Sequence, residues 1–115
     1  MIVEEIMKRE IHTLLPENTV RDAVRLMREE KVRHVPIVSS DNTVVGIITD
    51  HDLKNALPSC LREEPNSIIY DAPIEEIMVK NPIVGHPLDF VEEVASIFYD
   101  AKISCLPIVS AGKLV

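Results

Sequence analysis

An internal repeat limits the possible fold of this chain more than any other feature of its sequence. Residues 2–39 align without a gap with residues 73–110, and 11 of these 38 positions are identical. The segments Glu-Glu-Ile-Met and Pro-Ile-Val-Ser each occur once in either half. A unit of this length is too long for a solenoid turn and too short for a domain with a good core of its own. We therefore predict one domain made of two related halves packed about a pseudo-two-fold axis, with binding sites in the cleft between them.

The composition fits one small domain with an aliphatic core. The 115 residues include 46% hydrophobic residues and no Trp, and a chain of this size buries roughly two-thirds of its unfolded surface. The net charge of −7 argues against non-specific nucleic-acid binding, which requires a basic face. The sequence has two cysteines and neither a signal peptide nor a long apolar run. We therefore expect a cytoplasmic protein with reduced thiols and no contact with a membrane.

Each half is predicted to follow the order strand, helix, strand, strand, helix. In the first half, an extended stretch at 11–15 precedes a helix that begins at Thr19. Thr19 and Asp22 have the spacing of a capping box, in which each side chain accepts a hydrogen bond from the other residue's backbone. Apolar residues then recur with helical spacing on one face. This predicted stripe comprises Val20, Ala23, Val24 and Met27.

After this helix, residues 35–38 and 44–48 are predicted to form a hairpin, and residues 50–56 a short helix. In the second half, the capping box is predicted to begin at Asp89 and to be completed by Glu92. The apolar stripe of the second helix comprises Val91, Val94, Ala95 and Phe98.

The printed sequence ends before the second half can complete its last strand and helix. The segment Gly46 to Leu53 has no counterpart there, so we expect the natural chain to continue after Val115. We assign residues 1–57 to the first repeat, 58–73 to a connector and 74–115 to the second repeat.

These features resemble the CBS domain pair, the module named after cystathionine β-synthase. The resemblance covers essentially the whole chain. It rests on Glu-Ile-Met at the start of each half, on the capped helix, on residues 33–38, and on residues 46–53, which match the family pattern Gly-h-h-Thr/Ser-x-x-Asp. The sequence of residues 86–93 most resembles the acetoin-utilisation AcuB-like branch of the family. The resemblance implies an α+β fold of tandem CBS repeats with pseudo-two-fold symmetry.

The resemblance also implies a regulatory module that binds AMP, ADP, ATP or S-adenosylmethionine between the repeats. Asp52 occupies the family position whose carboxylate accepts both ribose hydroxyls, and Arg33 a position that reaches phosphate. The implied site comprises Thr49, Asp52, Arg33, His51, Ile83, Ser104, Cys105 and Leu106. A mirror-image site, incomplete because it lacks its Thr-x-x-Asp, would use Lys8, Ile11, Thr13, His34 and Val35.

Several alternatives remain open. Thr49 and Asp52 could simply cap the following helix, and Arg33 could be an ordinary surface arginine. The four histidines lack ligand spacing, so we expect no metal site. We find no nucleophile–base pair and no Gly-rich phosphate loop, so we expect no enzyme and no resident cofactor. The alternative function is a ligand-free interaction module, and for either function we expect the apolar helix stripes to form a homodimer.

Overall fold

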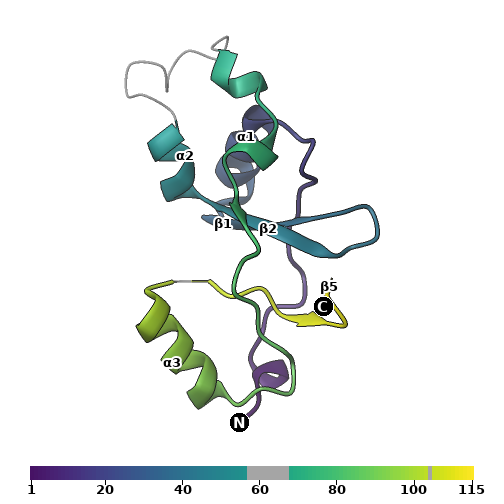
Figure 1. The fold of residues 1–115 in the computed structure, drawn as a ribbon, viewed down its shortest axis with the longest axis vertical. Helices are drawn as coiled ribbons and strands as arrows, with labels where there is room; N and C mark the ends of the chain where they lie inside the picture. The colour runs from purple at the N-terminus through teal and green to yellow at the C-terminus, as the bar shows by residue number, and fades with distance from the viewer. Residues whose placement is uncertain (57–67, 104) are drawn as a thin grey trace.

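The computed structural model describes residues 1–56, 68–103 and 105–115 of the chain. The two halves lie at opposite ends of an elongated molecule with extents of 46 × 30 × 23 Å, and the chain crosses between them more than once (Figure 1). Helices and antiparallel strands occur in both halves, so the predicted α+β fold is confirmed.

The first long helix, α1 (Val20–Glu30), begins where the sequence predicted. The backbone N–H of Thr19 donates to Asp22 Oδ2 over 2.9 Å, and the N–H of Asp22 donates to Thr19 Oγ1 over 3.3 Å. The first of these hydrogen bonds holds the pKa of Asp22 below its ordinary value. Val20 and Met27 are buried in the core of the first half. The stripe of α1 is therefore not available for the predicted helix-to-helix dimer, and that part of the expectation is wrong.

The first half also contains the predicted hairpin, formed by β1 (His34–Val38) and β2 (Val44–Thr49), and the short helix α2 (Asp50–Ala56). A third strand, β3 (Val79–Lys80), comes from the second repeat and pairs with β2. A glycine at position 46 favours this pairing, because a Cβ there would lie 2.5 Å from Met78 Sδ and 3.0 Å from the backbone oxygen of Val79.

The extended stretch at 11–15 is not a strand. Leu14 alone forms an isolated bridge to Ile37 of β1, with its N–H donating to the oxygen of Pro36. Pro36 has no N–H, so the ladder cannot continue along this stretch. The predicted first strand is therefore reduced to a single point of pairing.

The second half contains α3 (Val91–Ala101), and its capping differs from the prediction. The N-cap is Phe90, and no side chain caps this helix. Asp89 instead accepts a hydrogen bond from the N–H of His86 over 2.9 Å, in the turn before the helix. The predicted capping box at Asp89 and Glu92 is therefore wrong, because the carboxylate is used one turn earlier.

The second hairpin is short and contacts the loop of the first. It consists of β4 (Val109–Ser110) and β5 (Lys113–Leu114). The N–H of Leu114 donates to the oxygen of Asn42 over 3.1 Å, and Lys113 Nζ donates to the backbone oxygen of Asp41 over 2.8 Å. A hydrogen bond from the Ser39 hydroxyl is the main reason that the pKa of Asp41 falls to about 2. The two hairpins therefore meet at their tips.

Backbone hydrogen bonds between the halves occur in pairs that the alignment of the two repeats relates, which confirms the pseudo-two-fold symmetry. Val3 N–H donates to the oxygen of Asp89 over 2.9 Å, and the equivalent Ile74 N–H donates to the oxygen of Asn18 over 2.7 Å. Two further pairs are Val20 to Ala72 with Val91 to Met1, and Glu75 to Pro16 with Glu4 to Pro87. Each repeat therefore places its opening segment beside the helix of the other.

The hydrophobic cores also combine residues from the two repeats. Tyr70 and Ile74 are buried with α1 and the first hairpin, whereas Val3 is buried with Val94 and Ile108 of the second half. In the predicted connector at 58–73, the 3-10 helix η2 (Ile68–Asp71) thus contributes to the first core. The rest of that connector, up to residue 67, lies outside the described residues. Each hydrophobic core therefore includes residues from outside its own repeat, so the cores do not follow the repeat boundaries assigned from the sequence.

Candidate ligand cavity between the repeats

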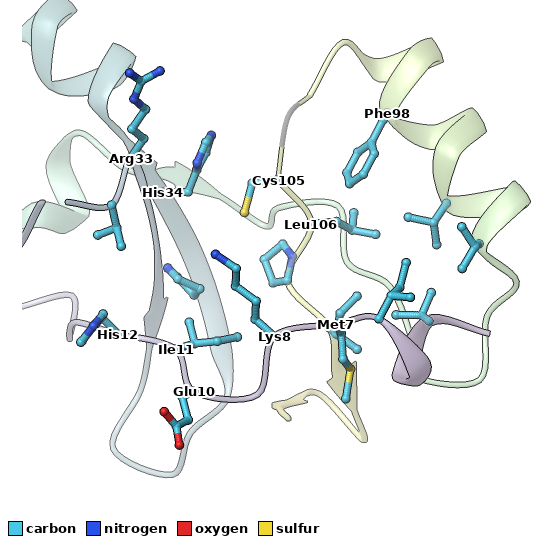
Figure 2. Close-up of a pocket in the computed structure, with 18 of the residues that line it drawn as sticks. Met7, Lys8, Glu10, Ile11, His12, Arg33, His34, Phe98, Cys105 and Leu106 are labelled. Carbon is cyan, nitrogen blue, oxygen red and sulfur yellow. The ribbon is translucent and has the colours of Figure 1, made fainter. Parts of the chain in front are cut away.

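A cavity of about 800 Å³ lies between the two halves. Three parts of the chain form its walls: the N-terminal segment within residues 3–12, residues 31–36 at the start of β1, and α3 together with residues 105–108 (Figure 2). This volume is within the range of about 300–1,000 Å³ that is typical of small-molecule sites. The crossing of the opening segment therefore creates a hollow to which both repeats contribute.

Much of the cavity wall is apolar. Ile11 lies on the side of the first half, and Phe98 and Leu106 lie on the side of the second half (Figure 2). Pro36 of β1 also lines the cavity. Cys105 lies between these sides, and burial raises the pKa of its thiol. A neutral thiol behaves as a small hydrophobic group, so Cys105 adds to the apolar surface. Walls of this kind can accept a flat ring.

The charged groups at the cavity are mainly basic. Lys8, Lys31 and Arg33 line it, together with one acidic residue, Glu10. The Lys8 side chain extends from the N-terminal segment into the middle of the cavity, whereas the Glu10 carboxylate points away on the other side of that segment (Figure 2). Among the described residues, neither Lys8 nor Arg33 takes part in a salt bridge. The cavity therefore combines apolar walls with a cationic side.

The structure brings together residues that the family resemblance had assigned to two different sites. Three residues of the implied main site line the cavity: Arg33, Cys105 and Leu106. Three residues of the mirror-image site line it as well: Lys8, Ile11 and His34. One cavity is therefore lined by residues that the resemblance assigned to two sites, and the ligand-binding roles of these residues stay predictions.

Other predicted residues lie elsewhere. Val35 is fully buried in the first core, and Thr13 is partly buried outside the cavity lining. Ile83 and His51 are exposed and do not line the cavity. Ser104 lies outside the described residues.

Thr49 and Asp52 form a capping box on α2. The N–H of Thr49 donates to Asp52 Oδ2 over 3.0 Å, and the N–H of Asp52 donates to Thr49 Oγ1 over 3.2 Å. Neither residue lines the cavity, but Thr49 pairs with His34 across the hairpin. The N–H of Asp50 also donates to the oxygen of Arg33 over 2.9 Å. The capping role is therefore confirmed, and the turn that provides it adjoins the cavity wall.

Sequence reasoning did not identify several lining residues, including Phe98, Lys31 and His12. Phe98 had been assigned to the apolar stripe of its helix, and nothing local separates a core position from a cavity wall. Lys31 and its counterpart Lys102 both end their helices in the left-handed conformation, with φ of 56° and 55°. Identity of this lysine in the two repeats was the available signal that its position is special.

Within the described ranges, no group of three or more His, Cys, Asp or Glu side chains is placed to hold a metal ion. The helices of these ranges also include none with the length and hydrophobicity needed to cross a membrane.

Among proteins of known sequence, the chain resembles part of a much longer relative. It is 35% identical over 114 residues to the homoserine O-acetyltransferase of Methanococcus vannielii. The match covers 99% of this chain but 22% of that protein. The similarity therefore concerns one region of that enzyme.

Solved structures share the whole fold. A Vibrio cholerae protein named for acetoin utilization (AcuB) is 35% identical with a TM-score of 0.86, and the match covers 100% of this chain and 81% of that one. CBSX2 from Arabidopsis thaliana, solved in complex with AMP, is 28% identical with a TM-score of 0.85 and coverages of 99% and 86%. The CBS domain pair of protein MJ0100, solved in complex with 5′-methylthioadenosine and S-adenosyl-L-methionine, is 28% identical with a TM-score of 0.82 and coverages of 100% and 85%.

The CBS domain family model matches residues 3–59 and 74–115, which contain all but the first residue of each half of the internal repeat. The chain belongs to the CBS domain family and contains two CBS repeats.

Proposed function

We propose that this chain is a regulatory module that binds an adenosine-containing ligand in the cavity between its two CBS repeats. The observation that carries the proposal is the cavity itself, which has a volume of about 800 Å³ and walls from both repeats. Its apolar and cationic sides suit the base and the anionic groups of a nucleotide. The complexes of CBSX2 with AMP and of MJ0100 with two adenosyl compounds support the choice of ligand class.

In the proposed complex, the adenine ring lies between the first-half wall at Ile11 and the second-half wall at Phe98 and Leu106. Asp52 does not line the cavity, so the ribose reaches past the cavity wall to the turn of α2, where Asp52 accepts its hydroxyl hydrogen bonds. Asp52 Oδ2 already accepts the Thr49 N–H, so Oδ1 is the oxygen assigned to the ribose. The anionic part of the ligand then lies near Arg33, which is next to this turn. The backbone oxygen of Arg33 accepts the N–H of Asp50, and the next residue, His34, pairs with Thr49.

A ligand in this position contacts both repeats at once, so its affinity depends on how the repeats are arranged. A ligand shifts a conformational equilibrium by as much as its affinities for the two states differ. Couplings of about 1–3 kcal/mol are typical of allosteric proteins. We propose that the chain transmits ligand binding to an attached domain or a partner protein in this way.

A thermal-shift panel with AMP, ADP, ATP and S-adenosylmethionine tests the proposal, with ribose 5-phosphate as a control that lacks the base. A ligand present at 100 times its Kd adds about 2.7 kcal/mol of stability. We expect a dose-dependent rise in the melting temperature with at least one adenosine compound and little change with the control. The absence of any shift with all four compounds would contradict the proposal.

A further inference from the structure

The charges around the cavity are opposite in sign to those of the whole chain. The sequence contains 12 Lys and Arg residues against 19 Asp and Glu residues. Among the described residues that line the cavity, Lys8, Lys31 and Arg33 are basic and Glu10 alone is acidic. This local excess of positive charge favours an anionic ligand, because the apolar walls limit the screening of charges by water.

Lys8 is the cation that projects most directly into the cavity. Its ammonium group lies toward the strand that carries His34, whereas the Glu10 carboxylate is directed away (Figure 2). Among the described residues, no carboxylate forms a salt bridge with Lys8. An anionic ligand would therefore gain a charge-assisted contact without displacing an existing partner.

Lys8 and Arg33 belong to the first repeat and are not repeated in the second, whereas Lys31 has Lys102 as its counterpart. The positions equivalent to Lys8 and His34 are Val79 and Cys105, and the sequence has Ser104 where the first repeat has Arg33. The flanking segments Glu-Glu-Ile-Met and Pro-Ile-Val-Ser are identical in the two repeats. Within this cavity, Lys8 and Arg33 therefore make the side contributed by the first repeat more cationic than the side that carries Cys105.

We propose, building on the function proposed above, that this cavity selects adenine nucleotides that carry phosphate groups, and that Lys8 determines this specificity. S-Adenosylmethionine carries a sulfonium, an ammonium and a carboxylate group, so its net charge is positive and the excess of basic groups at Lys8, Lys31 and Arg33 disfavours it. 5′-Methylthioadenosine keeps the adenosine part but has no phosphate, so it gains nothing from these cations. The expected order of affinity is ATP, then AMP, then 5′-methylthioadenosine, with S-adenosylmethionine last.

Titration calorimetry of the full chain with these four compounds tests the proposal, using the parent and two variants. Lys8→Val introduces the residue that the second repeat has at this position. Lys80→Val removes the same charge from an exposed strand residue outside the cavity and serves as the control. We expect Lys8→Val to weaken ATP by about ten- to a hundredfold, which corresponds to one lost charge-assisted hydrogen bond. AMP should lose less, 5′-methylthioadenosine should be unaffected, and Lys80→Val should resemble the parent.

Two results would overturn this proposal while leaving the proposed function intact. One is that 5′-methylthioadenosine or S-adenosylmethionine binds as tightly as ATP. The other is that Lys8→Val weakens all ligands by the same factor, because Lys8 would then not recognise phosphate. If none of the four compounds binds, the proposed function itself fails, and the selectivity fails with it.

Discussion

At the scale of single residues, the same Thr-x-x-Asp capping box occurs twice in the first half. In α1 the Thr19 N–H donates to Asp22 over 2.9 Å, and in α2 the Thr49 N–H donates to Asp52 over 3.0 Å. The geometry of the two boxes does not distinguish a helix cap from a ligand-binding carboxylate. The positions of the two boxes differ, because the hairpin places only the box of α2 beside the cavity wall.

This duplication provides a matched pair of variants for the ribose-binding role. Asp22→Ala and Asp52→Ala each remove a capping carboxylate, and each should cost about 0.5–2 kcal/mol of stability. Asp52→Ala should also weaken an adenine nucleotide about a hundredfold, because it removes two charge-assisted hydrogen bonds to the ribose. Asp22→Ala should leave the affinity unchanged. Titration calorimetry and urea unfolding measure the two effects, and equal affinities for both variants would show that Asp52 is a helix cap alone.

The lowered pKa of Asp22 predicts a dependence of stability on pH. Its pKa in the folded chain lies below the ordinary value of 3.8, chiefly because of the hydrogen bond from the Thr19 backbone. The carboxylate therefore contributes its full stabilisation above the unfolded pKa, and this contribution is lost as the pH falls through the folded pKa. Urea midpoints measured from neutral to acid pH should fall more steeply for the parent than for Asp22→Asn. Parallel curves would contradict this assignment.

At the scale of secondary-structure elements, the sequence predicted α1 correctly because its signals are local. The capping box and the apolar stripe both lie within α1 or directly before it. The strand β3 was missed because it depends on Gly46, which lies far away in the sequence, in the other repeat, and allows the close approach of Met78. The stretch at 11–15 was predicted as extended, but the missing N–H of Pro36 on the partner strand limits its pairing. Local patterns therefore predicted helices better than strand partners.

No side chain caps the start of α3, so a capping box like that of α1 should stabilise this helix. Phe90 occupies the N-cap position in an extended conformation, with φ −78° and ψ 141°, and the residue is 54% exposed. Thr19 is its counterpart in α1, and Glu93 lies where Asp22 completes the box. Phe90→Thr should therefore create a capping box and raise stability by about 0.5–2 kcal/mol. Chemical denaturation measures this gain, and Phe90→Ala is the control that removes the ring without adding a cap. A threonine variant no more stable than the alanine variant would disprove the capping argument.

At the scale of the whole molecule, the sequence identified the repeat and the family but not how residues divide between sites. Lys8, Arg33 and Cys105 were all named as candidates, yet they were assigned to different clefts. Their grouping depends on the opening segment of one repeat crossing to the other, as Val3 shows by packing with Val94. The alignment of the two repeats does not indicate whether an opening segment packs within its own half or the opposite half. The candidate residues were therefore predictable, but their combination was not.

The expectation of a homodimer stays a prediction, and we place it on the outer face of α3 because the stripe residues Val91, Ala95 and Phe98 line the cavity. The stripe of α1 is buried, whereas Tyr99 on α3 is 85% exposed. A dimer formed through the outer face of α3 should bury roughly 800 Å² on each partner. Light scattering at micromolar concentration should then give twice the mass of 12.9 kDa. Tyr99→Glu should convert the dimer to a monomer without unfolding it, and a monomeric parent would refute the prediction.

A crystal structure of the chain grown with saturating ATP would show whether an adenine nucleotide binds between the two repeats. We predict ATP in the cavity of about 800 Å³, with phosphate oxygens within hydrogen-bond distance of Lys8 or Arg33 and with the ribose hydroxyls at Asp52. An empty cavity at saturating ATP, or ATP bound on another surface of the chain, would contradict nucleotide binding between the repeats.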